Sequence, residues 1–139
     1  MQLVCPSCGT VNRVPQERLG DAPQCGKCGN PVLGDQPVEL SAATFERYIE
    51  RNELPVLVDF WAPWCGPCQQ FAPVFSRLAG PWATRVRFAK VNTEAEQALA
   101  ARHGIRSIPT LAVFKGGREV DRVSGALPAQ QLEAWLRRL

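Results

Sequence analysis

Six cysteines form three C-x-x-C pairs, and these are the residues of the chain with the clearest chemical potential. In a small secreted protein such pairs would suggest three disulfide bonds, whereas in a reducing cytosol they favour metal binding or redox catalysis. The surroundings of the pairs differ, so the three need not share one function. The pairs are Cys5 and Cys8, Cys25 and Cys28, and Cys65 and Cys68.

The first two pairs have the spacing of a zinc site. Sixteen residues separate Cys8 from Cys25, which gives C-x2-C-x16-C-x2-C, within the range of tetrahedral sites with four thiolate ligands. Gly9 and Gly29 permit tight turns in which backbone N–H groups point at sulfur. Two further disulfides or a redox relay are the alternatives. We predict one structural Zn²⁺ per chain, bound by Cys5, Cys8, Cys25 and Cys28.

The third pair has the surroundings of a redox site. Cys65 and Cys68 enclose Gly66 and Pro67, follow Trp64, and lie where a buried strand should meet a helix. The free N–H groups and positive dipole end of a first helical turn stabilise a thiolate, which is the form that attacks disulfides. We expect Cys65, nearer the helix start and solvent, to attack, and Cys68 to resolve the mixed disulfide. An inert pair or half of a second metal site would leave Pro67 and Trp64 without a purpose.

A change of composition near residue 40 divides the chain. All eleven aromatic residues lie in residues 45–139, and Gly and Pro are frequent just before residue 38. We assign residues 1–30 to a zinc-binding module, residues 31–36 to a linker and residues 37–139 to a second domain. A module of this size without aromatics needs a metal for its stability, while we expect the core of the second domain to be complete without the module.

The second domain alternates between helix and strand patterns and predicts an α/β fold. The near-continuous apolar run Val56–Phe60 is typical of a strand that is buried on both sheet faces. Thr110–Phe114 and Glu119–Val123, joined by a tight turn, predict an antiparallel hairpin that closes a parallel half. The remaining expected elements are a strand over Val86–Val91, helices over Ser41–Arg51 with Ser41 as the cap, Cys65–Ala79 and Glu94–Arg102, and a last helix after Pro128.

Asp59 is the charged residue inside the apolar run Val56–Phe60. An ionised carboxylate without a partner is costly in a buried strand, so Asp59 should be partly or wholly protonated near neutral pH and available for proton transfer. A turn residue at the end of the strand is the alternative interpretation.

Residues 37–139 resemble the thioredoxin family. The resemblance implies the thioredoxin fold, which is a central mixed sheet flanked by helices. Together with the N-terminal module, the chain resembles the thioredoxin-2 family, which are bacterial thioredoxins with an N-terminal zinc-binding extension. The matching motifs are Trp64-Cys65-Gly66-Pro67-Cys68, the preceding Val58–Ala62, the following Ala72-Pro73, the loop Gly104–Thr110, the turn Phe114–Gly117 and the pair Gly125-Ala126.

The resemblance also implies roles for individual residues. Asp59 would help to deprotonate Cys68 through water, Lys90 would modulate Asp59, and Pro109 would follow a cis peptide bond. The backbone of Ile108 would pair with an extended substrate segment. The flat apolar surface expected around the thiolate comprises Trp64, Gly66, Pro67, Ile108, Pro109, Gly125 and Ala126.

The activity implied by the resemblance is reduction of protein disulfides, with regeneration by thioredoxin reductase and NADPH and with no flavin or nicotinamide bound to this chain. Gly66-Pro67 is similar to the dipeptide of reductases, whereas more oxidising relatives usually have a histidine there. We expect the zinc-bound thiolates to be shielded and the Cys65 thiolate to be exposed, so that mild oxidant oxidises the third pair first.

Charge and hydropathy bear on three other kinds of function, namely binding of nucleic acid, docking of a protein and insertion into a membrane. The net charge is +3, and residues 1–36 are neutral and contain no aromatic side chain, which argues against a nucleic-acid partner. A module that docks a protein is an open alternative. No stretch has the length of a membrane span, and the first residues lack the pattern of a signal peptide. We expect a cytoplasmic monomer.

Overall fold

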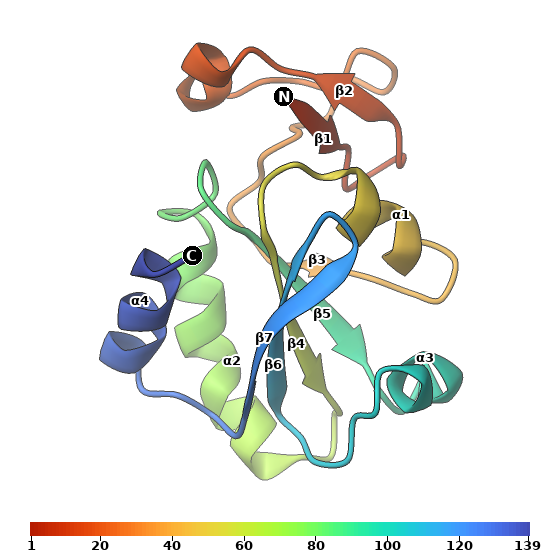
Figure 1. Cartoon of the computed structure of the whole chain (residues 1–139), viewed down its shortest axis with the longest axis vertical. Coiled ribbons are helices and arrows are strands. Elements are labelled where there is room, and N and C mark those ends of the chain that lie inside the picture. The colour runs from red at the N-terminus through yellow and green to blue at the C-terminus, as the bar shows by residue number, and fades with distance from the viewer.

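A computed structural model describes all 139 residues and contains one five-stranded mixed sheet (Figure 1). The sheet consists of β3 (Val38–Glu39), β4 (Val56–Trp61), β5 (Arg87–Asn92), β6 (Thr110–Lys115) and β7 (Arg118–Ser124). Their order is β3-β5-β4-β6-β7; β3, β5 and β4 are parallel, and β6 and β7 are antiparallel to their neighbours. The predicted parallel half closed by a hairpin is confirmed.

Two helices cover each face of the sheet (Figure 1). α1 (Phe45–Arg51) and α3 (Gln97–Arg102) lie on one face, and α2 (Gly66–Ala79) and α4 (Ala129–Arg137) lie on the other. Because successive side chains of a strand point to opposite faces of the sheet, β4 contributes residues to the cores on both faces. Val58 and Phe60 belong to the cluster that contains Phe45 of α1, while Leu57 belongs to the cluster that contains Phe71 of α2.

Two helices begin later than the sequence predicts. Ser41 does not cap α1; its backbone N–H donates to the hydroxyl of Thr44 at 2.9 Å, and the helix starts at Phe45 after this turn. α3 starts at Gln97, because the side chain of Asn92 accepts backbone N–H groups of the turn before it. Local hydrogen bonds of this kind compete with the first turn of a helix.

The N-terminal module contains a small antiparallel hairpin, β1 (Gln2–Val4) with β2 (Val11–Arg13), and the 3-10 helix η1 (Gln16–Asp21). Its buried cluster is aliphatic and includes two of the predicted metal ligands. Figure 1 shows the module at one end of the molecule and the start of α2 at the other. The cluster consists of Leu3, Cys5, Val14, Leu19, Cys25, Val32 and Leu54.

The module and the second domain share core residues. Val4 of β1 is buried in the cluster of α1 and β4, and Leu54, just before β4, is buried in the cluster of the module. The expectation that the core of residues 37–139 is complete without the module is therefore wrong, because the side chain of Val4 fills part of that core.

Hydrogen bonds strengthen the contact between the two parts. Asn52, which is 2% exposed, accepts the backbone N–H of Val4 at 2.9 Å and donates to the carbonyl of Tyr48 at 2.8 Å. Arg47 donates to the carbonyl of Gly9 at 2.8 Å. The first cysteine turn is thereby fixed against α1. None of the helices combines the length and the apolar character needed to cross a bilayer.

Candidate active site and metal centre

The third cysteine pair lies at the start of α2 and forms a disulfide bond. Cys65 occupies the N-cap position, and its sulfur accepts the backbone N–H of Cys68 at 3.2 Å. Pro67 lies in the first turn, where the missing N–H would have had no partner within the helix. The helix start therefore directs a hydrogen-bond donor at the sulfur of Cys65, where a thiolate would form after reduction.

The burial of the cysteines differs from the sequence-based expectation. Cys65 is 5% exposed and Cys68 is 2% exposed, so Cys65 lies nearer solvent by only a small margin. In contrast, Cys8 and Cys28 of the first two pairs are exposed. The expectation of an exposed Cys65 is wrong for the disulfide form, in which both sulfurs are buried. Shielding of the four module thiolates by a bound metal stays a prediction.

That neighbouring loop contains the cis peptide bond between Ile108 and Pro109 that the resemblance implies. The carbonyl oxygen of Ile108 lies 3.8 Å from the sulfur of Cys65, and Ile108 packs against the cysteine pair. The backbone N–H of Gly125 donates to the carbonyl of Pro109 at 2.8 Å. Gly125 has a φ of +102°, which glycine adopts readily. The structure thus brings together Cys65, Cys68, Ile108, Pro109 and Gly125.

The residues expected to surround the disulfide are mostly accessible. Trp64 is 69% exposed, and Ile108 and Gly125 are partly buried, while Pro109 is buried. A large exposed aromatic side chain beside a reactive sulfur is a ready contact for an apolar partner. Gly66, Pro67 and Ala126 are the other exposed members of this group.

Asp59 and Lys90 lie side by side in the sheet. They are register partners on β4 and β5. Asp59 is 1% exposed, and its Oδ1 atom has no hydrogen-bond partner. The ammonium group of Lys90 lies 4.3 Å from the ring centroid of Trp61 and forms no salt bridge with Asp59.

Burial raises the pKa of Asp59 from 3.8 to about 7, against a lowering effect of Lys90 and with a smaller raising effect of Glu39. A carboxyl group with this pKa exchanges a proton readily near neutral pH. The protonation expected from the sequence therefore has a structural basis in the burial of Asp59.

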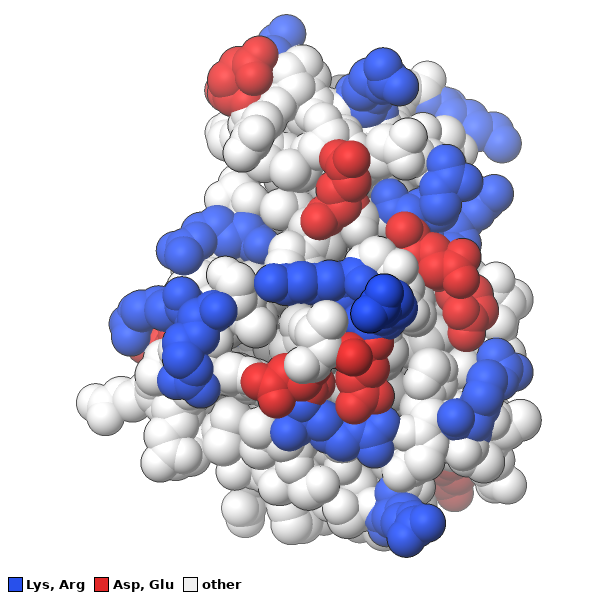
Figure 2. All heavy atoms as spheres, in the orientation of Figure 1, with Lys and Arg blue, Asp and Glu red and all other residues white.

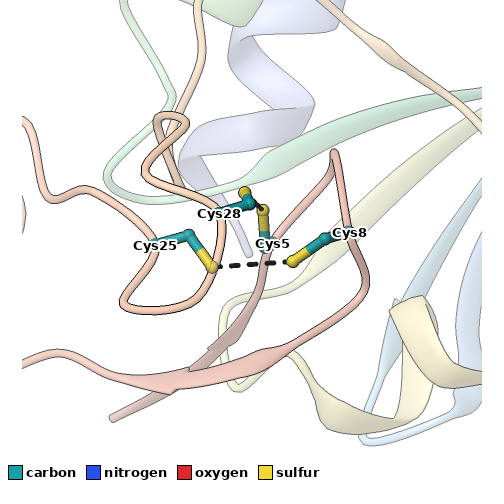
Figure 3. A group of neighbouring side chains, drawn as sticks. All are labelled: Cys5, Cys8, Cys25 and Cys28. Carbon is teal, nitrogen blue, oxygen red and sulfur yellow. Dashed lines mark hydrogen bonds between the residues drawn. The ribbon is translucent and has the colours of Figure 1, made fainter.

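The first two cysteine pairs form one cluster of four sulfurs (Figure 3). All four sulfur atoms lie within 4.8 Å of one another, and the closest distances, between Cys5 and Cys28 and between Cys8 and Cys25, are 3.6 Å. A tetrahedral zinc ion with Zn–S bonds of about 2.3 Å places its sulfurs about 3.8 Å apart. The cluster therefore has the size and donor set of a four-thiolate metal site.

The two cysteine turns have nearly the same backbone. The N–H of Gly9 donates to the carbonyl of Cys5, and that of Gly29 donates to the carbonyl of Cys25, each at 2.9 Å. Both glycines have positive φ, +78° and +79°. These turns hold the sulfurs in a converging arrangement.

The electrostatics of the cluster also suit a cation. Backbone N–H groups of Cys28 and Lys27 and the side chain of Asn12 lower the pKa of Cys25 to about 6, whereas burial raises the pKa of Cys5 to about 11. The side-chain amide of Asn12 donates to the sulfur of Cys25 at 3.4 Å, and its oxygen accepts the backbone N–H of Gly26 at 2.9 Å. A divalent cation would offset the cost of the buried thiolate.

Some residues of these sites could not be found from the sequence. Asn12 lies outside both C-x-x-C motifs, and Trp61 and Glu39 act on Lys90 and Asp59 only through the register of the sheet. Trp61 directly follows the predicted strand and lies within the family motif Val58–Ala62, but neither signal indicates its contact with Lys90.

Comparison with known proteins supports both parts of the chain. The family model described as Thioredoxin matches residues 36–138, and the one described as Thioredoxin 2, N-terminal, a zinc ribbon, matches residues 4–30. The chain is 46% identical to Thioredoxin C-3 of Corynebacterium nephridii over 138 residues, which cover 98% of this chain and 93% of that protein. The chain belongs to the thioredoxin family.

Other thioredoxins match the second domain. The thioredoxin of Porphyra purpurea is 47% identical over 98 residues, which cover 70% of this chain and 92% of that protein. The solved structure of a mutant thioredoxin from Halobacterium salinarum has a TM-score of 0.68 at 33% identity, covering 75% of this chain and 90% of that one. Thioredoxin of Malassezia sympodialis gives a TM-score of 0.65 at 34% identity, with coverages of 72% and 87%.

Membership of the thioredoxin family, together with the Cys65–Cys68 disulfide, shows a thiol-disulfide oxidoreductase. The chain has the thioredoxin fold with an N-terminal zinc-ribbon module. The four clustered cysteines of that module form a group that could hold a metal ion.

Proposed function

We propose that the chain reduces protein disulfides by dithiol–disulfide exchange. The observation that carries this proposal is the disulfide at the start of α2, beside the Ile108–Pro109 loop. In the reduced protein, the thiolate of Cys65 attacks one sulfur of a substrate disulfide and forms a mixed disulfide. The other substrate sulfur leaves as a thiolate and takes up a proton.

Cys68 then resolves the mixed disulfide. Its thiol loses a proton to Asp59 through water, and the resulting thiolate attacks the sulfur of Cys65. The second substrate sulfur leaves, so the substrate gains two electrons and the Cys65–Cys68 disulfide forms. Burial of Asp59 next to α2 supports this role, since a pKa of about 7 suits a proton acceptor at neutral pH.

Substrate proteins dock on the accessible surface around Cys65. Trp64 supplies exposed apolar area, and the backbone of Ile108 bonds an extended substrate segment. Such contacts use main-chain groups and apolar area, which different substrates share, so the site accepts many protein disulfides. Gly66, Pro67, Pro109, Gly125 and Ala126 complete this surface.

We further propose that the metal is one structural Zn²⁺ per chain, held by Cys5, Cys8, Cys25 and Cys28. The sulfur spacing and the turn geometry support this identity. When bound, zinc supplies folding free energy to a module whose own cluster has seven residues, one of them from the second domain.

The partners we propose are thioredoxin reductase, which returns electrons from NADPH to the Cys65–Cys68 disulfide, and diverse disulfide-containing proteins. We propose that the chain is a monomer. We assign it to the cytoplasm, because metal-binding thiols stay reduced in that compartment. We propose no nucleic-acid partner, because Figure 2 shows Lys and Arg interspersed with Asp and Glu rather than gathered into one basic surface on this face.

A coupled assay tests the function. NADPH oxidation is followed with a bacterial thioredoxin reductase and insulin as the protein disulfide, with the wild type, Cys65→Ser and Cys8→Ser. We expect turnover for the wild type, no turnover for Cys65→Ser and substantial turnover for Cys8→Ser. Turnover that survives in Cys65→Ser, or absence of turnover in the wild type, would exclude the proposed function.

A further inference from the structure

Three charged residues form one row across three neighbouring strands. Glu39 of β3 is the register partner of Lys90 of β5, and Lys90 is the register partner of Asp59 of β4. Strands β3, β5 and β4 are parallel, so paired residues point to the same face of the sheet. The three side chains are far apart in the sequence, and only the order of strands brings them together.

The packing of neighbouring residues identifies that face. Each of the three charged residues lies between two apolar residues that pack on the side of α1, so each points the other way, toward α2 and the redox pair. The apolar neighbours on the side of α1 are Val38 and Leu40 around Glu39, Ala89 and Val91 around Lys90, and Val58 and Phe60 around Asp59.

Exposure rises along this row. Asp59 is buried in the centre of the sheet, Lys90 is partly buried, and Glu39 is exposed on the edge strand β3. Lys90 forms a salt bridge with neither carboxyl group, and Trp61 holds its ammonium group over the ring. The ammonium group is therefore paired with neither acid, and its charge acts to lower the pKa of both Asp59 and Glu39.

Neither β6 nor the first turns of α2 place another charged side chain against Asp59. Toward β6, Asp59 is in register with Leu111, and the first charged residue of α2 is the exposed Arg77, near the end of the helix. Lys90 and Glu39 are also the charged groups that act on the pKa of Asp59, the first lowering it and the second raising it. In the oxidised protein, Cys65 and Cys68 do not titrate.

We propose that Glu39 is a positioning residue for thiol–disulfide exchange, whose carboxylate attracts the ammonium group of Lys90 away from Asp59 and so keeps the ionisation of Asp59 in the neutral pH range, where it can exchange a proton with Cys68. The inference rests on the proposed role of Asp59 in proton transfer. Glu39 lies at the surface and touches neither substrate nor the reacting sulfurs. It acts through Lys90. Its removal should change the pH at which Asp59 ionises and should not change which groups react.

The test follows the carboxyl carbon of Asp59 by NMR during a pH titration of the oxidised full-length protein. In Glu39→Gln, Lys90 is left to stabilise the Asp59 carboxylate alone, so the titration midpoint should fall by about 0.5–1 pH unit. Glu39→Asp should restore most of the wild-type midpoint. Glu50→Gln, the same charge change on the opposite side of the sheet, should leave it unmoved.

A second background tests the route through Lys90. In Lys90→Gln, adding Glu39→Gln should move the midpoint by less than half of its effect in the wild type. An unshifted midpoint in Glu39→Gln, or an undiminished shift in the Lys90→Gln background, overturns the inference.

Turnover measured in parallel separates the two proposals. The rate of insulin reduction with dithiothreitol as electron donor should shift its pH profile in the same direction as the NMR midpoint. If the midpoint of Asp59 shifts and the pH profile does not, the inference about Glu39 stands and the proton-transfer role of Asp59 fails.

Discussion

Asp59 lies near the middle of β4 with 1% of its surface exposed and with Oδ1 unpaired. Its pKa of about 7, compared with an ordinary value of 3.8, means that the folded state holds a proton that the unfolded chain has lost. Between these pH values the native state binds more protons than the unfolded state, so stability falls as pH rises. The buried acid therefore costs stability in the pH range in which we propose that it transfers a proton.

Because of this cost, Asp59→Asn should stabilise the oxidised protein to a degree that depends on pH. Near pH 4 the variant and the wild type should be similarly stable, and the advantage of the variant should grow up to pH 7 and then level off at no more than about 4 kcal/mol. Urea unfolding at pH 4.5, 6 and 8 measures it, with Asp35→Asn as an exposed control. An advantage that is the same at every pH would contradict the ionisation of a buried Asp59.

At the residue level, the sequence predicted the residues whose chemistry follows from local spacing. The two C-x-x-C turns of the module and the redox pair at a helix start needed only neighbouring residues and general chemistry. Lys90 and Pro109 needed the family resemblance, because nothing local indicates a partner across strands or a cis bond. Glu39 was not identified, since its relation to Asp59 depends on strand order.

The contact between β1 and α1 decides how the two parts of the chain are held together. Val4 is buried among residues of the second domain, and Asn52 satisfies the backbone N–H of Val4 within that contact. An unpaired buried N–H costs about 1–3 kcal/mol. The side chain of Asn52 thus fixes the position at which Val4 of β1 packs into the core of the second domain.

Asn52→Ala should lower the free energy of unfolding by about 2 kcal/mol, because it leaves the N–H of Val4 without a partner. Denaturant unfolding of the full chain checks this value. Asn30→Ala, at an exposed position whose side chain forms no hydrogen bond, should change stability by less than about 0.5 kcal/mol. Equal effects of the two substitutions would show that the contact contributes nothing.

For the elements, the sequence predicted the order of the helices and the four longer strands of the second domain. Their apolar patterns are long enough to show a period. The two-residue strand β3 and the short hairpin of the module have too few residues for that, and the starts of α1 and α3 are set by side-chain hydrogen bonds.

Over the whole molecule, the N-terminal module with its four cysteines lies at one end, and the start of α2, where the redox disulfide forms, lies at the other (Figure 1). The module packs where β4 begins, and α2 begins beyond the other end of β4. Direct exchange between the two sets of sulfurs within one chain is therefore not supported, and the redox relay weighed from the sequence is the less favoured use of the first four cysteines. What connects the module to the second domain is the shared core.

Removal of the metal should consequently affect the second domain. Without the ion, β1 loosens and Val4 leaves a cavity in the core, so the unfolding temperature should fall by roughly 5–10 °C while disulfide reduction at 25 °C persists. Calorimetry before and after chelation, with Zn²⁺ added back as the control, measures the change. An unchanged unfolding temperature would show that the second domain does not depend on the module.

The most direct test of the account is capture of the mixed disulfide by intact mass spectrometry. Reduced Cys68→Ser is mixed with a protein disulfide, and the adduct is mapped after digestion. Because attack by Cys65 survives and resolution does not, we predict one substrate molecule bound covalently through Cys65, and no adduct with Cys65→Ser. An adduct formed through Cys5, Cys8, Cys25 or Cys28, or equal behaviour of the two variants, would contradict the assigned roles.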